Sequence, residues 1–124
     1  MNAQHATECE LLVMQAIWAH PEKELSMPEI LENVKEMYQK DWAPQTVSTF
    51  LRRLVKRGFV KSTRHGRTFL YTPLISLKDF REATILDSCN FWCEGDAAKM
   101  LTYLNDAKKL TADEKRAIQE LLNA

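Results

Sequence analysis

Apolar residues recur at helical spacing in three stretches of the first half of the chain. These stretches predict helices over about 7–19, 26–40 and 44–57. Thr7 and Ser26 are each followed three residues later by glutamate, as in a capping box, and Pro44 lies in the first turn of the third helix. One face of that helix is apolar (Val47, Phe50, Leu51, Leu54 and Val55). Its opposite face is polar and basic.

The period of the pattern then changes to two. Segments 59–64 and 67–72 are rich in aromatic and β-branched residues and flank His65-Gly66, which predicts an antiparallel β-hairpin with a glycine in its turn. A two-residue loop there would place Arg64 opposite Arg67. Like charges opposite one another destabilise a hairpin unless an anion lies beside them, so we expect the tip to contact phosphate. Helices followed by such a hairpin indicate a winged helix-turn-helix domain, whose third helix would enter the DNA major groove.

Beyond Pro73 the sequence is acidic and apolar, and three further helices are predicted. Ser76 caps the first, the second begins near Ala97, and Thr111 with Glu114 caps the third. Helices this short bury little surface alone, so we expect them to form a homodimer interface; alternatively they fold back on their own winged domain. The candidate interface residues are Phe80, Leu86, Trp92, Met100, Leu101, Leu104, Ile118 and Leu121.

The predicted fold is therefore mainly α-helical with a small antiparallel β-hairpin. It has two parts, a winged helix-turn-helix DNA-binding domain over 1–75 and a helical dimerisation region over 76–124. Positive charge is concentrated in one segment of the first part. The chain is formally neutral, yet 42–75 contains seven basic residues and no Asp or Glu. Clustered cations favour a polyanion such as nucleic acid, although a basic face could instead meet an acidic protein partner.

Composition argues against several classes of protein. No apolar run approaches the roughly 20 residues of a membrane-spanning helix, and no secretory signal is visible. Three cysteines are too few for a disulfide scaffold, which favours a reducing cytoplasm. We find no phosphate-binding glycine loop, HExxH motif or nucleophile elbow, and expect neither a cofactor nor catalysis. Cys89 and Cys93 share a helix face and could bind a metal or sense oxidation, but buried cysteines more often only pack.

Several separately placed motifs resemble the penicillinase-repressor (BlaI/MecI/CopY) family of bacterial transcriptional repressors. The matching segments are ELLVM (10–14), IW (17–18), WAPQTVSTFLRRL (42–54), KRG (56–58) and GRTFLYTP (66–73). The resemblance implies a homodimer that binds a palindromic operator and blocks transcription. Two other hypotheses stay open at this point: a winged-helix module for protein interaction, and a metal- or thiol-responsive regulator that uses Cys89 and Cys93.

The resemblance also implies which residues contact DNA. The base-facing positions would lie at the start of the third helix (Gln45, Thr46, Ser48 and Thr49). Cations on that helix and on the hairpin would contact phosphate (Arg52, Arg53, Lys56, Arg64 and Arg67). Thr46 and Thr49 could instead be structural caps, and Trp42 is expected to be a core residue.

Members of this family that respond to β-lactams are cleaved by a membrane sensor-protease at an Asn-Phe bond in the second tail helix. The corresponding pair here is Tyr103-Leu104. Copper-responsive members carry four closely spaced cysteines near the C-terminus, whereas 94–124 contains none. The change from Asn-Phe argues against cleavage by the family's usual sensor-protease, so a membrane sensor-protease stays a candidate partner only if its preference differs. The chain itself is expected not to insert into a membrane.

Overall fold

The contacts of the chain divide it into two compact units. In the computed structural model, which describes residues 6–124, the first unit ends at Thr84 and the second is Ile85–Ala124. The boundary lies inside one helix, α4 (Leu77–Cys93). The predicted division between residues 75 and 76 concerns function, namely DNA binding and dimerisation, and stays a prediction.

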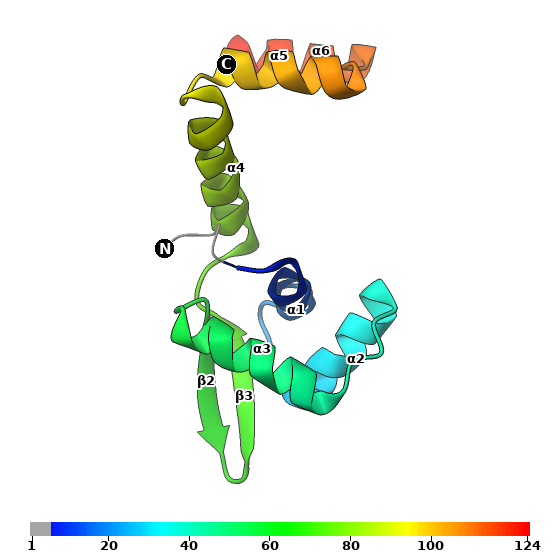
Figure 1. Ribbon diagram of the computed structural model, residues 1–124, viewed down its shortest axis with the longest axis vertical. Coiled ribbons are helices and arrows are strands. Elements are labelled where there is room, and N and C mark those ends of the chain that lie inside the picture. The colour runs from blue at the N-terminus through cyan, green and yellow to red at the C-terminus, as the bar shows by residue number, and fades with distance from the viewer. Residues whose placement is uncertain (1–5) are drawn as a thin grey trace. The chain divides into compact units, whose positions relative to one another are not determined.

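The first unit contains three helices, a small sheet and the start of α4. Its elements are α1 (Glu8–Trp18), β1 (Leu25–Ser26), α2 (Met27–Tyr38), α3 (Pro44–Lys56), β2 (Val60–His65) and β3 (Thr68–Pro73). The strands form one antiparallel sheet in the order β1-β3-β2. Figure 1 shows α1, α2 and α3 grouped together, with the β2–β3 hairpin, or wing, extending past them. The predicted mainly helical fold is confirmed, with one strand more than the sequence indicated.

Local capping explains where the helices begin. At α2, the Ser26 hydroxyl accepts the Glu29 N–H at 3.4 Å and the Glu29 carboxylate accepts the Ser26 N–H at 3.1 Å, which completes the predicted box. That backbone bond, with Lys23 beside it, lowers the pKa of Glu29 to about 2. At α1 only half of the box forms: the Thr7 hydroxyl accepts the Glu10 N–H at 3.2 Å, while the Glu10 carboxylate accepts the Thr7 hydroxyl at 3.1 Å and not the Thr7 N–H.

The register of the hairpin differs from the predicted one. The turn is Gly66-Arg67, so Arg64 lies opposite Phe69 and not opposite Arg67. Gly66 takes a φ of 64°, and glycine at the first of two turn positions suits a type II′ turn, whereas the prediction put it second. Arg64 and Arg67 therefore do not face one another, and the prediction that a phosphate relieves their repulsion is wrong. Arg64 instead stacks its guanidinium on the Phe69 ring, 5.9 Å from the ring centre.

One hydrophobic core joins all the elements of the first unit. Its most deeply buried residues come from the three helices and the sheet (Val13, Met14, Ala16, Ile17, Leu25, Ile30, Val34, Val47, Leu51, Leu54, Phe59 and Val60). Phe80 of α4 completes this core, because its ring lies 5.1 Å from that of Trp18 and 5.5 Å from that of Phe59. Only 5% of Phe80 is exposed, so we remove it from the candidate dimer interface.

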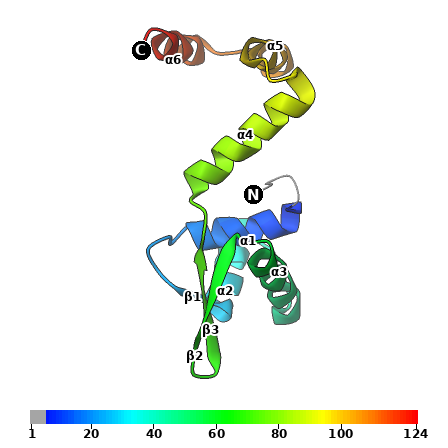
Figure 2. The same cartoon turned by 90° about the vertical axis from the view of Figure 1, so that its left-hand side faces the viewer.

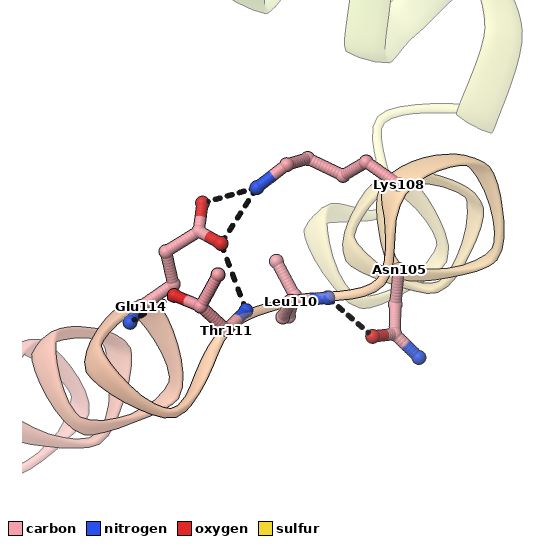
Figure 3. Close-up of polar contacts among 5 residues, drawn as sticks. All are labelled: Asn105, Lys108, Leu110, Thr111 and Glu114. Carbon is pink, nitrogen blue, oxygen red and sulfur yellow. Dashed lines mark hydrogen bonds and ion pairs between the residues drawn. The ribbon is translucent and has the colours of Figure 1, made fainter.

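The second unit contains the rest of α4, α5 (Ala97–Lys108) and α6 (Ala112–Leu122). A polar junction joins α5 to α6 (Figure 3). The Lys108 ammonium lies 2.6 Å from both oxygens of the Glu114 carboxylate, which also accepts the Thr111 N–H at 2.9 Å. Lys108 first, and Thr111 second, lower the pKa of Glu114 to about 2. The predicted capping box at Thr111 is confirmed.

The lowered pKa of Glu114 makes the junction sensitive to acid. A carboxyl group whose pKa is lower in the folded state stabilises the fold above its ordinary pKa of 4.5, and this contribution is lost as the pH falls towards 2. We expect the Thr111 amide shift, measured by NMR, to stay constant from pH 6 to about pH 3.5. The Glu114→Gln variant should shift this amide at every pH, whereas Glu120→Gln, which removes the same charge elsewhere on α6, should not. A Thr111 midpoint near 4.5 would contradict this account of the junction.

Candidate nucleic-acid interface

The polar and basic side chains of α3 share one face because the apolar ones are buried. Val47, Leu51 and Leu54 are at most 1% exposed and recur at i, i+4 and i+7. The rest of the helix surface carries all seven of its predicted contact residues (Gln45, Thr46, Ser48, Thr49, Arg52, Arg53 and Lys56). Thr46, Ser48 and Thr49 are half-buried, and the other four are exposed. The structure thus brings these predicted residues together on one surface.

The start of α3, unlike that of α1, α2, α5 and α6, has no side-chain cap. Its N-cap is Ala43, no side chain caps it, and its first turn contains no acidic residue. Neither Thr46 nor Thr49 therefore acts as the N-terminal cap that sequence analysis left open. The Thr49 hydroxyl donates to the Gln45 carbonyl at 3.0 Å and keeps its lone pairs free to accept. The positive end of the helix dipole is left without a side-chain partner.

The wing supplies the second part of the basic surface. Figure 2 shows the hairpin running down past α3 to its turn. Arg64 and Arg67 are both exposed at this end, and the Arg64 Nε–H donates to the Gly66 carbonyl at 2.9 Å. One carboxylate lies near the tip, since Glu24 Oε2 is 3.5 Å from His65 Nε2.

A groove of about 300 Å³ separates α3 from the wing. It is lined by Ser48, Arg52, Val55, Ser62, Phe69 and Tyr71. A second hollow of about 280 Å³ runs along α3 and is lined by Thr49, Arg52, Arg53 and Lys56. Ser62, Phe69 and Tyr71 were not among the predicted contact residues. Their alternation along the strands was visible, but their approach to Ser48, Arg52 and Val55 is a tertiary contact that the pattern within the hairpin does not show.

Arg57 does not belong to this surface, although it adds to the charge of 42–75. Its Nη1 lies 2.6 Å from Oε2 of Glu10, whose side chain is 0% exposed. The pair joins the end of α3 to α1, with the other Glu10 oxygen accepting the Thr7 hydroxyl. Trp42 likewise packs inward, with its ring 5.3 Å from that of Phe50, as predicted for a core residue.

The two cysteines of α4 lie in an apolar setting. Cys89 is 7% and Cys93 is 3% exposed, and Cys93 shares a pocket with Met100 and Leu104. Within residues 6–124 there is no group of three or more His, Cys, Asp and Glu side chains arranged to hold a metal ion. The structure supports packing as the role of both thiols.

The bond expected to be the target of a sensor-protease lies inside α5. Tyr103 is 55% and Leu104 is 46% exposed, but both are helical, so cleavage there would require this helix to open locally. This partner stays a prediction. No helix in the described part of the chain is long and apolar enough to cross a membrane.

Comparison with known proteins places this arrangement in a family. Residues 6–124 match the family model of the penicillinase repressor. The chain belongs to the penicillinase repressor family. It is 28% identical to the penicillinase repressor of Bacillus licheniformis over 116 residues, which cover 94% of this chain and 88% of that protein. It is also 28% identical to the methicillin resistance regulatory protein MecI of Staphylococcus aureus (strain N315), over 94% of this chain and 92% of that protein.

A solved structure from this family supports the winged-helix fold. The solution structure of the DNA-binding domain of the repressor BlaI is 33% identical in sequence to this chain, with a TM-score of 0.51. The likeness covers 60% of this chain and 87% of that domain. The predicted membership of the penicillinase repressor family and the predicted winged helix-turn-helix are both confirmed.

The pair between Arg57 and Glu10 should contribute to stability rather than to binding. We expect Arg57→Met to lower the free energy of unfolding by about 2–4 kcal/mol, because it leaves the Glu10 carboxylate buried without its cation. Urea unfolding followed by circular dichroism measures this loss. The control Arg53→Met, at an exposed position of the same helix, should change it by no more than about 0.5 kcal/mol. Equal stabilities of the two variants would show that the pair is not structural.

Proposed function

We propose that this chain is a transcriptional repressor that binds an operator in duplex DNA. The observation that carries the proposal is the set of exposed cations on α3 and the wing, in a segment without Asp or Glu, on the winged-helix fold of a repressor family. Such a protein acts by occupying DNA and catalyses no reaction. Such a repressor would be located in the cytoplasm, where it has access to its operator.

The chemistry of α3 suits a division between recognition and positioning. Gln45 can form two hydrogen bonds to an adenine edge in the major groove, and the hydroxyls of Ser48 and Thr49 can donate or accept. Arg52, Arg53 and Lys56 follow further along the helix and would contact phosphates, as would Arg64 and Arg67 on the wing. The uncapped start of α3 adds a positive helix end beside the same surface.

We propose further that the chain binds as a homodimer through its second unit. This unit exposes a set of large apolar side chains that a monomer would leave in water (Ile85, Leu86, Phe91, Trp92, Leu101, Tyr103, Leu104, Leu121 and Leu122). Among them Trp92, Tyr103 and Leu104 line an apolar pocket of about 300 Å³ that a side chain of a second copy could fill. A two-fold dimer places its two α3 helices on successive major grooves, which matches a palindromic operator.

A selection experiment tests this function. The full chain is offered a pool of random duplexes at low salt, and the affinity for the selected duplex is compared with that for an unrelated duplex of equal length. We expect selective binding that weakens steeply with salt, and a selected sequence with two related half-sites. Failure to bind any duplex at low ionic strength would overturn the proposal and leave a protein-interaction module as the alternative.

Two substitutions on α3 should act in different ways. Arg52→Ala should weaken binding to every duplex and lower the salt slope by about one, because one phosphate contact is lost. Gln45→Ala should instead change the preference at one base pair, by about 1–3 kcal/mol. Arg116→Ala, which removes an equal charge from α6, is the control and should bind like the parent. Identical effects of the first two variants would show that the division between base and phosphate contacts is wrong.

The dimer proposal has its own measurement. Leu104→Ala should weaken self-association by about tenfold or more in sedimentation equilibrium, because Leu104 lines the pocket in the second unit. Leu74→Ala makes the same change at a residue of the first unit that is 57% exposed, and should leave self-association unchanged. A parent that stays monomeric at all concentrations would contradict the proposal.

A further inference from the structure

One face of the β2–β3 hairpin has two environments along its length. Its inner end packs against the hydrophobic core, and its outer end lines the groove next to α3. Residues directly opposite one another on β2 and β3 share a face, and on this face Ser62 pairs with Tyr71 and then Arg64 pairs with Phe69. Tyr71 packs against the core, whereas Phe69, one step further out, is 47% exposed. The core face of the wing thus extends beyond the core, into the groove next to Ser48 and Arg52 of α3.

The lining of this groove alternates in chemical character. Val55, Phe69 and the ring of Tyr71 are apolar, while Arg52 is cationic and Ser48 and Ser62 offer hydroxyl groups. The backbone of DNA alternates in the same way, with anionic phosphates separated by the apolar C–H faces of deoxyribose. No acidic residue lines the groove to repel a phosphate. A purely apolar ligand would leave Arg52 without a partner, and a free anion would leave the aromatic rings unused.

Arg64 is held at one end of this face before any ligand binds. Its guanidinium lies over the Phe69 ring, and its Nε–H is engaged by the Gly66 carbonyl. Both Nη groups remain to donate to a phosphate. Because the side chain is already ordered, less conformational entropy is lost when it binds. The exposed Phe69 ring can thereby act in two ways, since one part of it orients Arg64 and the rest is available to pack against a deoxyribose.

We propose that this groove seats the sugar–phosphate backbone of one DNA strand. A deoxyribose lies against the rings of Phe69 and Tyr71, the phosphates on either side of it are bound by Arg52 and Arg64, and the hydroxyls of Ser62 and Tyr71 donate to those phosphates. The inference rests on the proposed function, because it needs DNA on this surface. It adds Ser62, Phe69 and Tyr71 to the DNA contacts, and it separates their role from that of the exposed cations.

The test uses the full chain and the duplex selected from the random pool. Phe69→Ala should weaken binding about three- to tenfold and leave the salt slope unchanged, since no charge is removed. Hydroxyl-radical cleavage, which reports the exposure of each deoxyribose, should show one or two sugars per half-site losing protection. Arg52→Ala, by contrast, should lower the salt slope by about one.

Conservative variants guard against a wing that fails to fold. Ser62→Ala and Tyr71→Phe remove only hydroxyl groups from the groove, and each should weaken binding about two- to fivefold. Thr63→Ala removes a hydroxyl from the neighbouring position, which faces the other side of the hairpin, and should bind like the parent.

The outcomes separate this inference from the function on which it rests. Selective loss of affinity and of sugar protection in the groove variants supports it. If the parent binds its duplex but Phe69→Ala, Ser62→Ala and Tyr71→Phe all keep full affinity and protection, the inference is overturned and the repressor function stands. If the parent binds no duplex at low salt, both are overturned.

Discussion

The burial of three aliphatic side chains of α3 determines which residues the protein can offer to DNA. Val47, Leu51 and Leu54 together remove one face of the helix from water, and each such side chain is worth about 1.5–3 kcal/mol when fully buried. Rotating the helix by one residue would turn it by about 100° and drive Arg52 into the core. The orientation of the polar face is therefore enforced by the core, and no contact with DNA is needed to set it.

Two carboxylates of the first unit form interactions within the fold and lie away from the basic surface of α3. Glu29 caps α2 and Glu10 neutralises Arg57, so both are used inside the fold. At α3 the pattern is reversed, because the helix begins without an acidic residue or a side-chain cap. Asp or Glu in its first turn would stabilise the helix, but would also repel a phosphate from the surface. Among the first three helices, only α3 lacks an acidic residue in its first turn. This suits a surface that binds a polyanion.

The helices could be predicted because their signals are local. Thr7, Ser26 and Thr111 each precede a helix, and the apolar period that follows is several turns long. β1 could not be predicted, since two residues carry no period, and the hairpin register depended on which turn position Gly66 occupies. Phe80 was assigned to the dimer because an apolar stripe does not reveal whether it packs within one chain or between two. The groove residues were missed for a related reason, since Phe69 and Ser48 are neighbours only in three dimensions.

Ser26 belongs to two elements at once. It is the last residue of β1, where it pairs with Leu70 of β3, and it is also the N-cap of α2. The middle of β3 and the start of α2 are thus joined at one residue, and α2 packs with α3 in the same core. The spacing between wing and α3 is consequently a property of the protein that its ligand has to match. A duplex that engages both has to present its groove and backbone at this spacing, so base pairs that the protein never touches would influence affinity through the shape and stiffness of the DNA.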